Sequence, residues 1–194
     1  MGVTSVGSRT MADRLALAEL IALYSRALDR MDLELARECW WPDGTDDHAP
    51  LYSGSIEGFW AWLWPVHEKM LLTRHVVTNT LFSLNGDEAA TESYWTATMR
   101  LPGPGGLVDL QSGGRYVDGF ARREGEWRFR HRQSIREWGR ADPAMTGSGS
   151  PITGLVESNA PTAPVTPPRR DRSDYSYRHI SSPLGRARAD SDDI

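Results

Sequence analysis

The sequence lacks most features that mark secreted, membrane-spanning or nucleic-acid-binding chains. It has one cysteine, Cys39, in 194 residues, so no disulfide forms within the chain, which fits a reducing cytoplasmic compartment. No stretch approaches about 18 apolar residues, and residues 1–10 lack the charged-then-apolar pattern of a signal peptide. The formal net charge is −4 without a continuous basic face. We therefore expect a cytoplasmic protein that binds neither membranes nor nucleic acid.

Motifs for several common chemistries are missing as well. The glycines of residues 103–106 and 113–114 do not have the spacing of a phosphate-binding loop. No Cys/His spacing suggests zinc, because His67 and His75 are expected far apart on different elements. Cys39 and the serines have no recognisable nucleophile context. We therefore expect neither a metal nor a cofactor.

Composition divides the chain into three parts. Hydrophobic residues make up 39% and charged residues 25% of it, as in ordinary globular proteins. Residues 1–10 are expected to be a flexible leader and residues 11–140 one domain. From residue 141 to residue 194 Pro, Gly, Ser and Thr dominate, which predicts a partly disordered C-terminal arm. Within that arm, residues 169–178 contain Arg, Asp and Tyr and are expected to be more ordered.

Helical periodicity is concentrated before residue 70. It predicts a helix over residues 13–28, a short one over 33–39 capped by Asp32, and a third over 55–69 capped by Ser55. Pro65 predicts a kink or break near Trp64. Between the second and third helices, a turn is expected at residues 42–44 and a short strand at 46–52.

The pattern then changes to that of β-strands. Asn85-Gly86 is a strong hairpin signal, Glu124-Gly125 predicts another turn, and residues 101–106 form a Pro/Gly loop. The expected strands are residues 75–84, 88–100, 108–123 and 127–138. Helices followed by a meander of hairpins predict an α+β fold.

Asp29 and His75 are candidates for acid–base chemistry. Asp29 follows the first predicted helix, where a carboxylate is unfavourable because the helix C-terminus is already negative. His75 opens the first long strand, and histidine is the side chain best suited to take a proton near neutral pH. Taken singly, such residues are more often a solvated acid in a turn and an ordinary core or surface histidine. The two can meet only through the fold.

Tyr24 and Arg132 are further candidates. Tyr24 lies on another helix face than Asp29 unless the helix end bends, and its hydroxyl could donate to a substrate carbonyl; a packed aromatic is the equal alternative. Strand alternation puts Arg128, Arg130 and Arg132 on one face, which is expected to be solvent-exposed. A bulge would be needed to turn Arg132 into a pocket, where it could hold an oxyanion or carboxylate.

Four strings, in this order, resemble the SnoaL-like branch of the nuclear transport factor 2-like superfamily over residues 14–138. They are LYSRALD (23–29), CWWPDG (39–44), TRHVVTN (73–79), and GRYVD (114–118) followed by RREGEWRF (122–129). The branch includes scytalone dehydratase, hexachlorocyclohexane dehydrochlorinase and bile-acid 7α-dehydratase. The resemblance implies a cone-shaped α+β barrel, in which three N-terminal helices pack on a curved antiparallel sheet that encloses a pocket. It also implies a homo-oligomer, with a trimer favoured over a dimer.

The resemblance also assigns roles to residues. It makes His75 the base and Asp29 its partner, with Tyr24 and Arg132 as companions, and it offers no obvious second pocket histidine. Eight tryptophans favour a heavy core and, for some of them, an aromatic pocket. The candidate substrate-binding residues are Trp40, Trp41, Trp62, Trp64, Asn79 and Trp95. The C-terminal stretch 170–174 is expected to fold back over a subunit.

The expected function is that of a cofactor-independent lyase. A His–Asp dyad would catalyse a dehydratase-like β-elimination on a hydrophobic cyclic, polyketide- or steroid-like small molecule. One alternative is an isomerase or cyclase that uses the same base. Another is a non-catalytic binding module or a protein like the β subunit of ring-hydroxylating dioxygenases, because one fold serves several functions.

Overall fold

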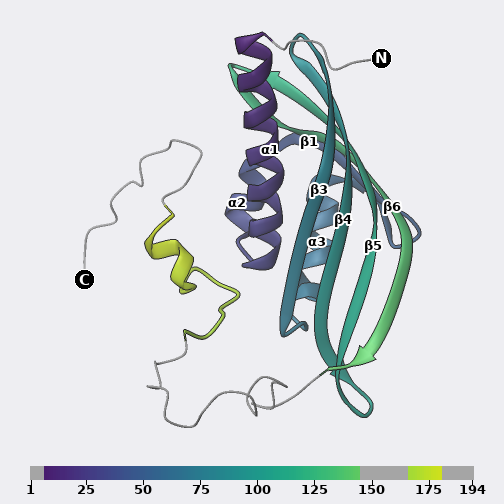
Figure 1. Cartoon of the computed structure of the whole chain (residues 1–194). Helices are drawn as coiled ribbons and strands as arrows, with labels where there is room; N and C mark the ends of the chain where they lie inside the picture. The colour runs from purple at the N-terminus through teal and green to yellow at the C-terminus, as the bar shows by residue number, and fades with distance from the viewer. Residues whose placement is uncertain (1–6, 145–165, 181–194) are drawn as a thin grey trace.

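Three helices and a six-stranded sheet form the body of the protein (Figure 1). The computed structural model describes residues 7–144 and 166–180, so most of the predicted leader and much of the C-terminal arm lie outside the described residues. The elements are α1 (Ser8–Asp29), α2 (Leu33–Glu38), β1 (Trp40–His48), β2 (Tyr52–Ser55), α3 (Ile56–His67), β3 (Leu72–Asn85), β4 (Glu88–Gly103), β5 (Gly106–Arg123), β6 (Glu126–Pro143) and the 3₁₀ turn η2 (Tyr175–Arg178). The predicted α+β class is confirmed. None of the helices in the described ranges is long and apolar enough to cross a membrane.

The predicted helix caps are present. The Asp32 carboxylate accepts a hydrogen bond from the Leu35 N–H at 3.2 Å, and the Ser55 hydroxyl accepts one from the Gly58 N–H at 3.2 Å. The helix α1 begins at Ser8, earlier than predicted, and takes up the end of the expected leader. The predicted break at Pro65 is wrong, because Pro65 lies inside α3 and the helix continues past it to His67.

The sheet has the strand order β2-β1-β6-β5-β4-β3, which makes β3 an edge strand. The predicted hairpins are confirmed, with positive φ angles at Gly86 in the first turn and at Glu124 and Gly125 in the last. The expectation of a wholly antiparallel sheet is wrong, since β1 pairs with β6 in parallel. Because α3 and the whole meander separate these two strands in sequence, no hairpin sets their relative direction.

One expected turn is absent, and one expected loop is shorter than predicted. Residues 42–44 belong to β1, next to an irregular register between Trp40 and Thr45, and not to a turn. Between β4 and β5 only residues 104 and 105 lie outside the strands, because both strands extend into the predicted Pro/Gly loop. Because β4 and β5 are long, their side chains extend from one end of the sheet to the other.

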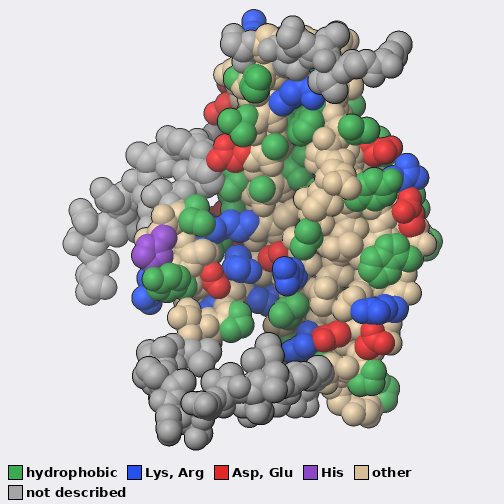
Figure 2. Space-filling view, in the orientation of Figure 1, with side chains coloured by type: hydrophobic (Ala, Val, Ile, Leu, Met, Phe, Trp, Pro, Cys, Tyr) green, Lys and Arg blue, Asp and Glu red, His purple; other side chains and the backbone are tan. Residues whose placement is uncertain are grey.

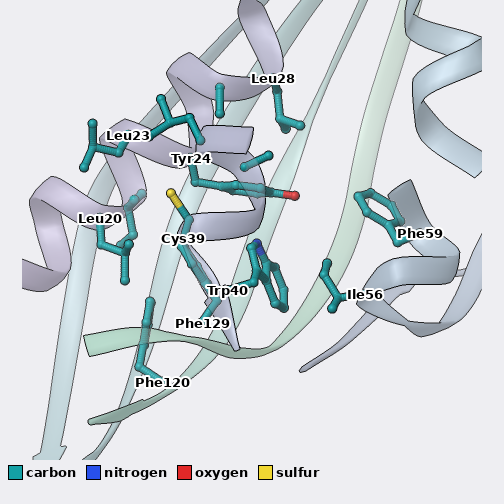
Figure 3. Close-up of a cluster of buried hydrophobic side chains, with 14 of the residues drawn as sticks. Leu20, Leu23, Tyr24, Leu28, Cys39, Trp40, Ile56, Phe59, Phe120 and Phe129 are labelled. Atoms are coloured by element: carbon teal, nitrogen blue, oxygen red, sulfur yellow. The ribbon is translucent and has the colours of Figure 1, made fainter. Parts of the chain in front are cut away.

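The core lies between α1, α3 and the sheet (Figure 3). Leu17, Ala27 and Phe129 are fully buried, and the Trp40 ring stacks on Phe129 with 5.0 Å between ring centroids. Burial of this apolar surface fixes α1 against the sheet, because each buried aromatic side chain contributes roughly 2–3 kcal/mol. The last turn of α1 is thereby placed beside the start of β3.

Candidate active site

Asp29 and His75 meet where α1 ends and β3 begins. The Asp29 Oδ1 lies 2.7 Å from His75 Nδ1, and the His75 backbone N–H donates to Asp29 Oδ2 at 2.9 Å. The two side chains are largely buried, with exposed fractions of 13% for Asp29 and 8% for His75. Both carboxylate oxygens are therefore engaged by the same residue, which fixes the position and the orientation of the imidazole. Asp29 and His75 are called the dyad below.

The contact with the carboxylate sets the chemistry of the imidazole. An ionised carboxylate only accepts hydrogen bonds, so the proton of a neutral His75 resides on Nδ1. The other ring nitrogen, Nε2, then carries a lone pair, and it makes no hydrogen bond to any residue in the described ranges. Such an imidazole is prepared to accept a proton at Nε2.

A hollow of about 500 Å³ lies beside the dyad, between α1 and β3. Its apolar wall comes from Ala18, Ile21, Ala22, Val76 and Val77. Its polar lining comes from the dyad and from Ser25, Arg26, Arg30 and Thr80. Ligand-binding sites typically combine a mostly apolar wall with a few placed polar groups, and this hollow has both.

His67, the last residue of α3, lies against His75. The two imidazole rings are stacked with their centroids 6.3 Å apart, so the expectation that these histidines are far apart is wrong. Burial, and then the neighbouring His75 and Arg170, lower the pKa of His67 to about 4. His67 is therefore a neutral imidazole at pH 7, and it is a second histidine beside the dyad.

Arg132 points into the core and not to solvent. Phe129 pairs with Phe120 and His131 pairs with Gly119, so Arg130 is an extra residue in β6 and the alternation is reversed beyond it. The expected solvent exposure of Arg132 is wrong, and the alternative with a bulge is right: the residue is 3% exposed. Its Nε and Nη2 donate to the two oxygens of Asp118 at 2.7 and 2.8 Å.

A second polar cluster surrounds Arg132 on the inner face of the sheet. Its guanidinium lies 3.8 Å from the Tyr116 ring centroid and 5.1 Å from that of Tyr24. Asp46 of β1 pairs with Arg132 of β6. One oxygen of the Asp46 carboxylate contacts His48 Nδ1, and the other is buried and has no hydrogen-bond partner among the described residues. Burial, and then the charge of Asp46, raise the pKa of Tyr24 well above its usual value, so its hydroxyl remains protonated.

The structure therefore groups the four candidate catalytic residues into two pairs. The dyad forms one pair, and Tyr24 with Arg132 forms the other. Burial raises the pKa of Tyr116, whose ring lies over the Arg132 guanidinium, so its hydroxyl is also protonated.

None of the six candidate substrate-binding residues lines the hollow at the dyad. Trp40 is a core residue, and Trp95 stacks on Tyr116 at 5.2 Å. Trp62 stacks on Tyr52 at 5.8 Å.

The other three candidates lie nearer the surface. Trp64 borders a separate hollow of about 520 Å³. Trp41 donates from its indole N–H to the Ala121 carbonyl and lies under two arginine side chains on the surface. Asn79 is exposed, at an irregularity of β3 with a φ of 53°. The candidate tryptophans therefore lie in the core or nearer the surface, and none of them lines the hollow at the dyad.

The segment formed by residues 166–180, called the C-terminal segment below, packs near the dyad. Arg170 donates to the carbonyl oxygens of His67, at 2.8 Å, and Met70, and to the Thr73 hydroxyl at 3.2 Å. Arg172 binds Asp32 at 2.9 and 3.1 Å. The segment is thereby held against α2 and against the residues that connect α3 with His75. Within this segment, residues 175–178 form the 3₁₀ turn η2.

The sequence contains only weak indications that several other residues near the site are buried. His67 continues the buried stripe of α3 at four-residue spacing after Leu63, where it is indistinguishable from a core residue. Asp46 with His48, and Tyr116 with Asp118, alternate along their strands as inward-facing residues do, but polar residues at such positions predict solvent. Among the described residues, no group of three His, Cys, Asp or Glu side chains could hold a metal ion.

Comparisons with known proteins identify the fold and the family of the domain. The model of the SnoaL-like domain matches residues 9–133, whereas no protein with a curated description matches the chain. Hexachlorocyclohexane dehydrochlorinase LinA-type3 from Novosphingobium barchaimii has a similar structure, with a TM-score of 0.63 and 15% identity, over 72% of this chain and 97% of its own. The Kfla4162 protein from Kribbella flavida has a TM-score of 0.62 and 19% identity, over 67% of this chain and 94% of its own.

Identities this low establish a shared fold and nothing more. The domain match covers well over half of the chain and includes both members of the dyad. The chain therefore belongs to the SnoaL-like domain family of the nuclear transport factor 2-like superfamily.

Proposed function

We propose that the protein is a lyase of the dehydratase type, in which His75 is the general base and Asp29 its partner. The observation that carries the proposal is the dyad geometry: Asp29 holds His75 through Nδ1 at 2.7 Å and through the backbone N–H at 2.9 Å, which leaves Nε2 free. Both residues line a hollow of about 500 Å³ that has an apolar wall. A dyad ready for proton transfer counts against a purely structural or binding role.

The proposed reaction is a β-elimination. His75 Nε2 takes a proton from a carbon next to a carbonyl group, and the electrons of the broken C–H bond form a C=C bond while the bond to the leaving group breaks. For a hydroxyl leaving group, the imidazolium returns its proton to the departing oxygen, so water is released. Asp29 stabilises the imidazolium between these steps, and general acid–base catalysis of this kind contributes about 10²–10⁴-fold. The balance of atoms and charge needs no cofactor.

Arg132 and Tyr24 do not line the hollow beside the dyad, so their proposed contribution is to a part of the substrate that reaches the inner face of the sheet. Because Nε and Nη2 of Arg132 are occupied by Asp118, Nη1 is the atom of this guanidinium that remains for a developing oxyanion. The protonated Tyr24 hydroxyl is a second donor in the same cluster. We propose a small hydrophobic cyclic substrate and a homo-oligomer, preferably a trimer. An isomerase or cyclase would begin with the same proton abstraction, and product analysis separates these reactions.

The test compares His75→Ala with a matched surface variant. Wild-type protein is incubated with a panel of cyclic β-hydroxy ketones and cyclic β-chloro compounds, and mass spectrometry follows the loss of water or hydrogen chloride. We expect turnover in the wild type and in His131→Ala, because His131 is exposed and contacts Thr45 at the surface. Loss of turnover in a folded His75→Ala protein supports the proposal, and retained turnover refutes it.

A further inference from the structure

A second His–Asp pair lies on β1, outside the dyad. The Asp46 Oδ1 contacts His48 Nδ1, and because the two residues are two positions apart, strand alternation directs both to the same face. The other ring nitrogen of His48, Nε2, makes no hydrogen bond to any residue in the described ranges. The Asp46 side chain is completely buried, whereas that of His48 is 24% exposed. As in the dyad, a carboxylate occupies Nδ1 of an imidazole and Nε2 is free.

The His48 imidazole packs beside the residues that are proposed to hold the substrate oxygen. His48 and Arg132 contact the same tyrosine ring, since the Tyr116 centroid lies 6.2 Å from that of His48 and 3.8 Å from the Arg132 guanidinium. The His48 ring also stacks on Phe59 with 5.0 Å between centroids. Figure 3 shows that the Tyr24 hydroxyl points toward Phe59. His48 therefore belongs to the same cluster as Arg132 and Tyr24.

The charges of this cluster differ from those of the surface. Acidic and basic side chains lie side by side at the surface over the sheet (Figure 2), whereas Asp46, Asp118 and Arg132 are at most 3% exposed. Arg132 donates two hydrogen bonds to Asp118, but Asp46 Oδ2 is buried without a hydrogen-bond partner among the described residues. Two carboxylates and one guanidinium leave one negative charge, which is cancelled when His48 is an imidazolium. Because an uncompensated buried charge is unfavourable, the cationic form of His48 suits the cluster.

From this grouping we infer that His48 is the general acid of the site, and that its Nε2–H protonates the substrate oxygen that becomes negative when His75 removes a proton from carbon. Asp46 is then a positioning residue, because it holds Nδ1 and balances the imidazolium. Arg132 and Tyr24 donate hydrogen bonds to that oxygen but keep their protons, since arginine does not ionise and burial raises the pKa of Tyr24. Imidazole, by contrast, transfers a proton readily near neutral pH. The inference rests on the proposed function and adds a second proton carrier to it.

The protons balance over one turnover. His75 Nε2 takes the proton from carbon, and His48 Nε2 gives its proton to the carbonyl oxygen, which yields a neutral enol. The enol returns this proton to His48 as its C=O bond forms again, while its C=C electrons shift to the next pair of carbons and the leaving group departs with its bonding electrons. A departing hydroxyl takes the proton of His75, and with a departing chloride that proton passes to solvent water. Both imidazoles thus regain their starting states.

The test uses the full-length protein with a cyclic β-chloro ketone and the β-chloro nitro compound of the same ring. Removal of the α-proton gives an enolate from the ketone and a nitronate from the nitro compound, and the nitronate is by far the weaker base. Chloride needs no proton in either case, so only the ketone depends on an acid at its oxygen. We expect His48→Gln to lower turnover of the ketone by about 10²–10⁴-fold and to leave that of the nitro compound unchanged.

The matched control is His131→Gln, which should lower neither rate, because His131 is exposed and contacts Thr45. Asp46→Asn should repeat the selective loss of the ketone. Equal losses for both compounds in His48→Gln would assign His48 a structural role and overturn the inference, as would no loss for either.

A measurement on the wild type decides the matter even where His48→Gln does not fold. Deuterium oxide should slow the ketone more than the nitro compound, because only the ketone takes an exchangeable proton at its oxygen, and equal effects contradict the inference. The proposed function fails by a different result, namely retained turnover of both compounds in His75→Ala.

Discussion

Asp29→Asn is the substitution whose consequences the dyad geometry defines most closely. In the wild type the two carboxylate oxygens accept from two N–H groups of one residue, at 2.7 and 2.9 Å. An amide has the same shape but only one acceptor oxygen. If that oxygen keeps the backbone N–H of His75, which the fold holds in place, the amide NH₂ faces Nδ1. Nδ1 must then accept, and the imidazole proton moves to Nε2, the atom that acts as the base.

This change of tautomer allows two magnitudes to be estimated. Exchanging charge-assisted hydrogen bonds for neutral ones lowers the free energy of unfolding by about 1–2 kcal/mol. Removing the base from Nε2 lowers turnover by a factor on the order of 10²–10⁴. The effect on activity is thus larger than the effect on stability, which distinguishes a chemical role from a structural one.

The assay for Asp29→Asn has one part that needs no substrate. Nitrogen-15 NMR of labelled histidine distinguishes the two neutral tautomers, and we expect His75 to switch from the Nδ1–H to the Nε2–H form. Asp87→Asn serves as the control, because Asp87 is a surface carboxylate that binds Arg122. An Asp29→Asn protein with the wild-type tautomer and wild-type turnover would show that Asp29 does not set the tautomer of His75.

Three further predictions concern the core and its titratable groups. Phe129→Ala removes a fully buried ring and should cost about 3–5 kcal/mol in urea unfolding; a loss below about 1 kcal/mol would contradict the packing described. Burial raises the pKa of Cys39 to about 12, so its thiol should resist alkylation at pH 8 until urea unfolds the chain, and rapid labelling of folded protein would disagree. The pKa of His67 is lowered to about 4, so only the unfolded chain protonates it between about pH 6.5 and 4, and stability should fall across that window as pH falls. Replacing His67 with Gln should flatten this slope, and an unchanged slope would assign it to other groups.

Local chemistry in the sequence was sufficient to predict much of the fold. Asp32 and Ser55 cap their helices because a short oxygen-bearing side chain before an apolar stripe satisfies free N–H groups. Asn85-Gly86 and Glu124-Gly125 predict their hairpins because glycine readily adopts the positive φ angles found at Gly86 and Gly125. The parallel pairing of β1 with β6 was not predictable in this way, since it depends on contacts between residues far apart in sequence.

The candidate site was predictable only in part for the same reason. The resemblance to known dehydratases pointed to Asp29 and His75, but their 2.7 Å contact depends on how α1 packs against β3. The orientation of Arg132 depends on one extra residue, Arg130, in a strand whose alternation otherwise predicts the opposite face. The place of Arg170 depends on a segment that returns to the domain from about 100 residues further along the chain than its partners.

The most direct test of the account is the position of a bound ligand relative to His75. A crystal structure of the protein with a substrate analogue or product gives the distance from Nε2 to the carbon that loses its proton. We predict a distance of about 3–3.5 Å, with Nδ1 still hydrogen-bonded to Asp29. A ligand bound elsewhere, or one whose reacting carbon lies out of reach of Nε2, would contradict the assignment of His75 as the base.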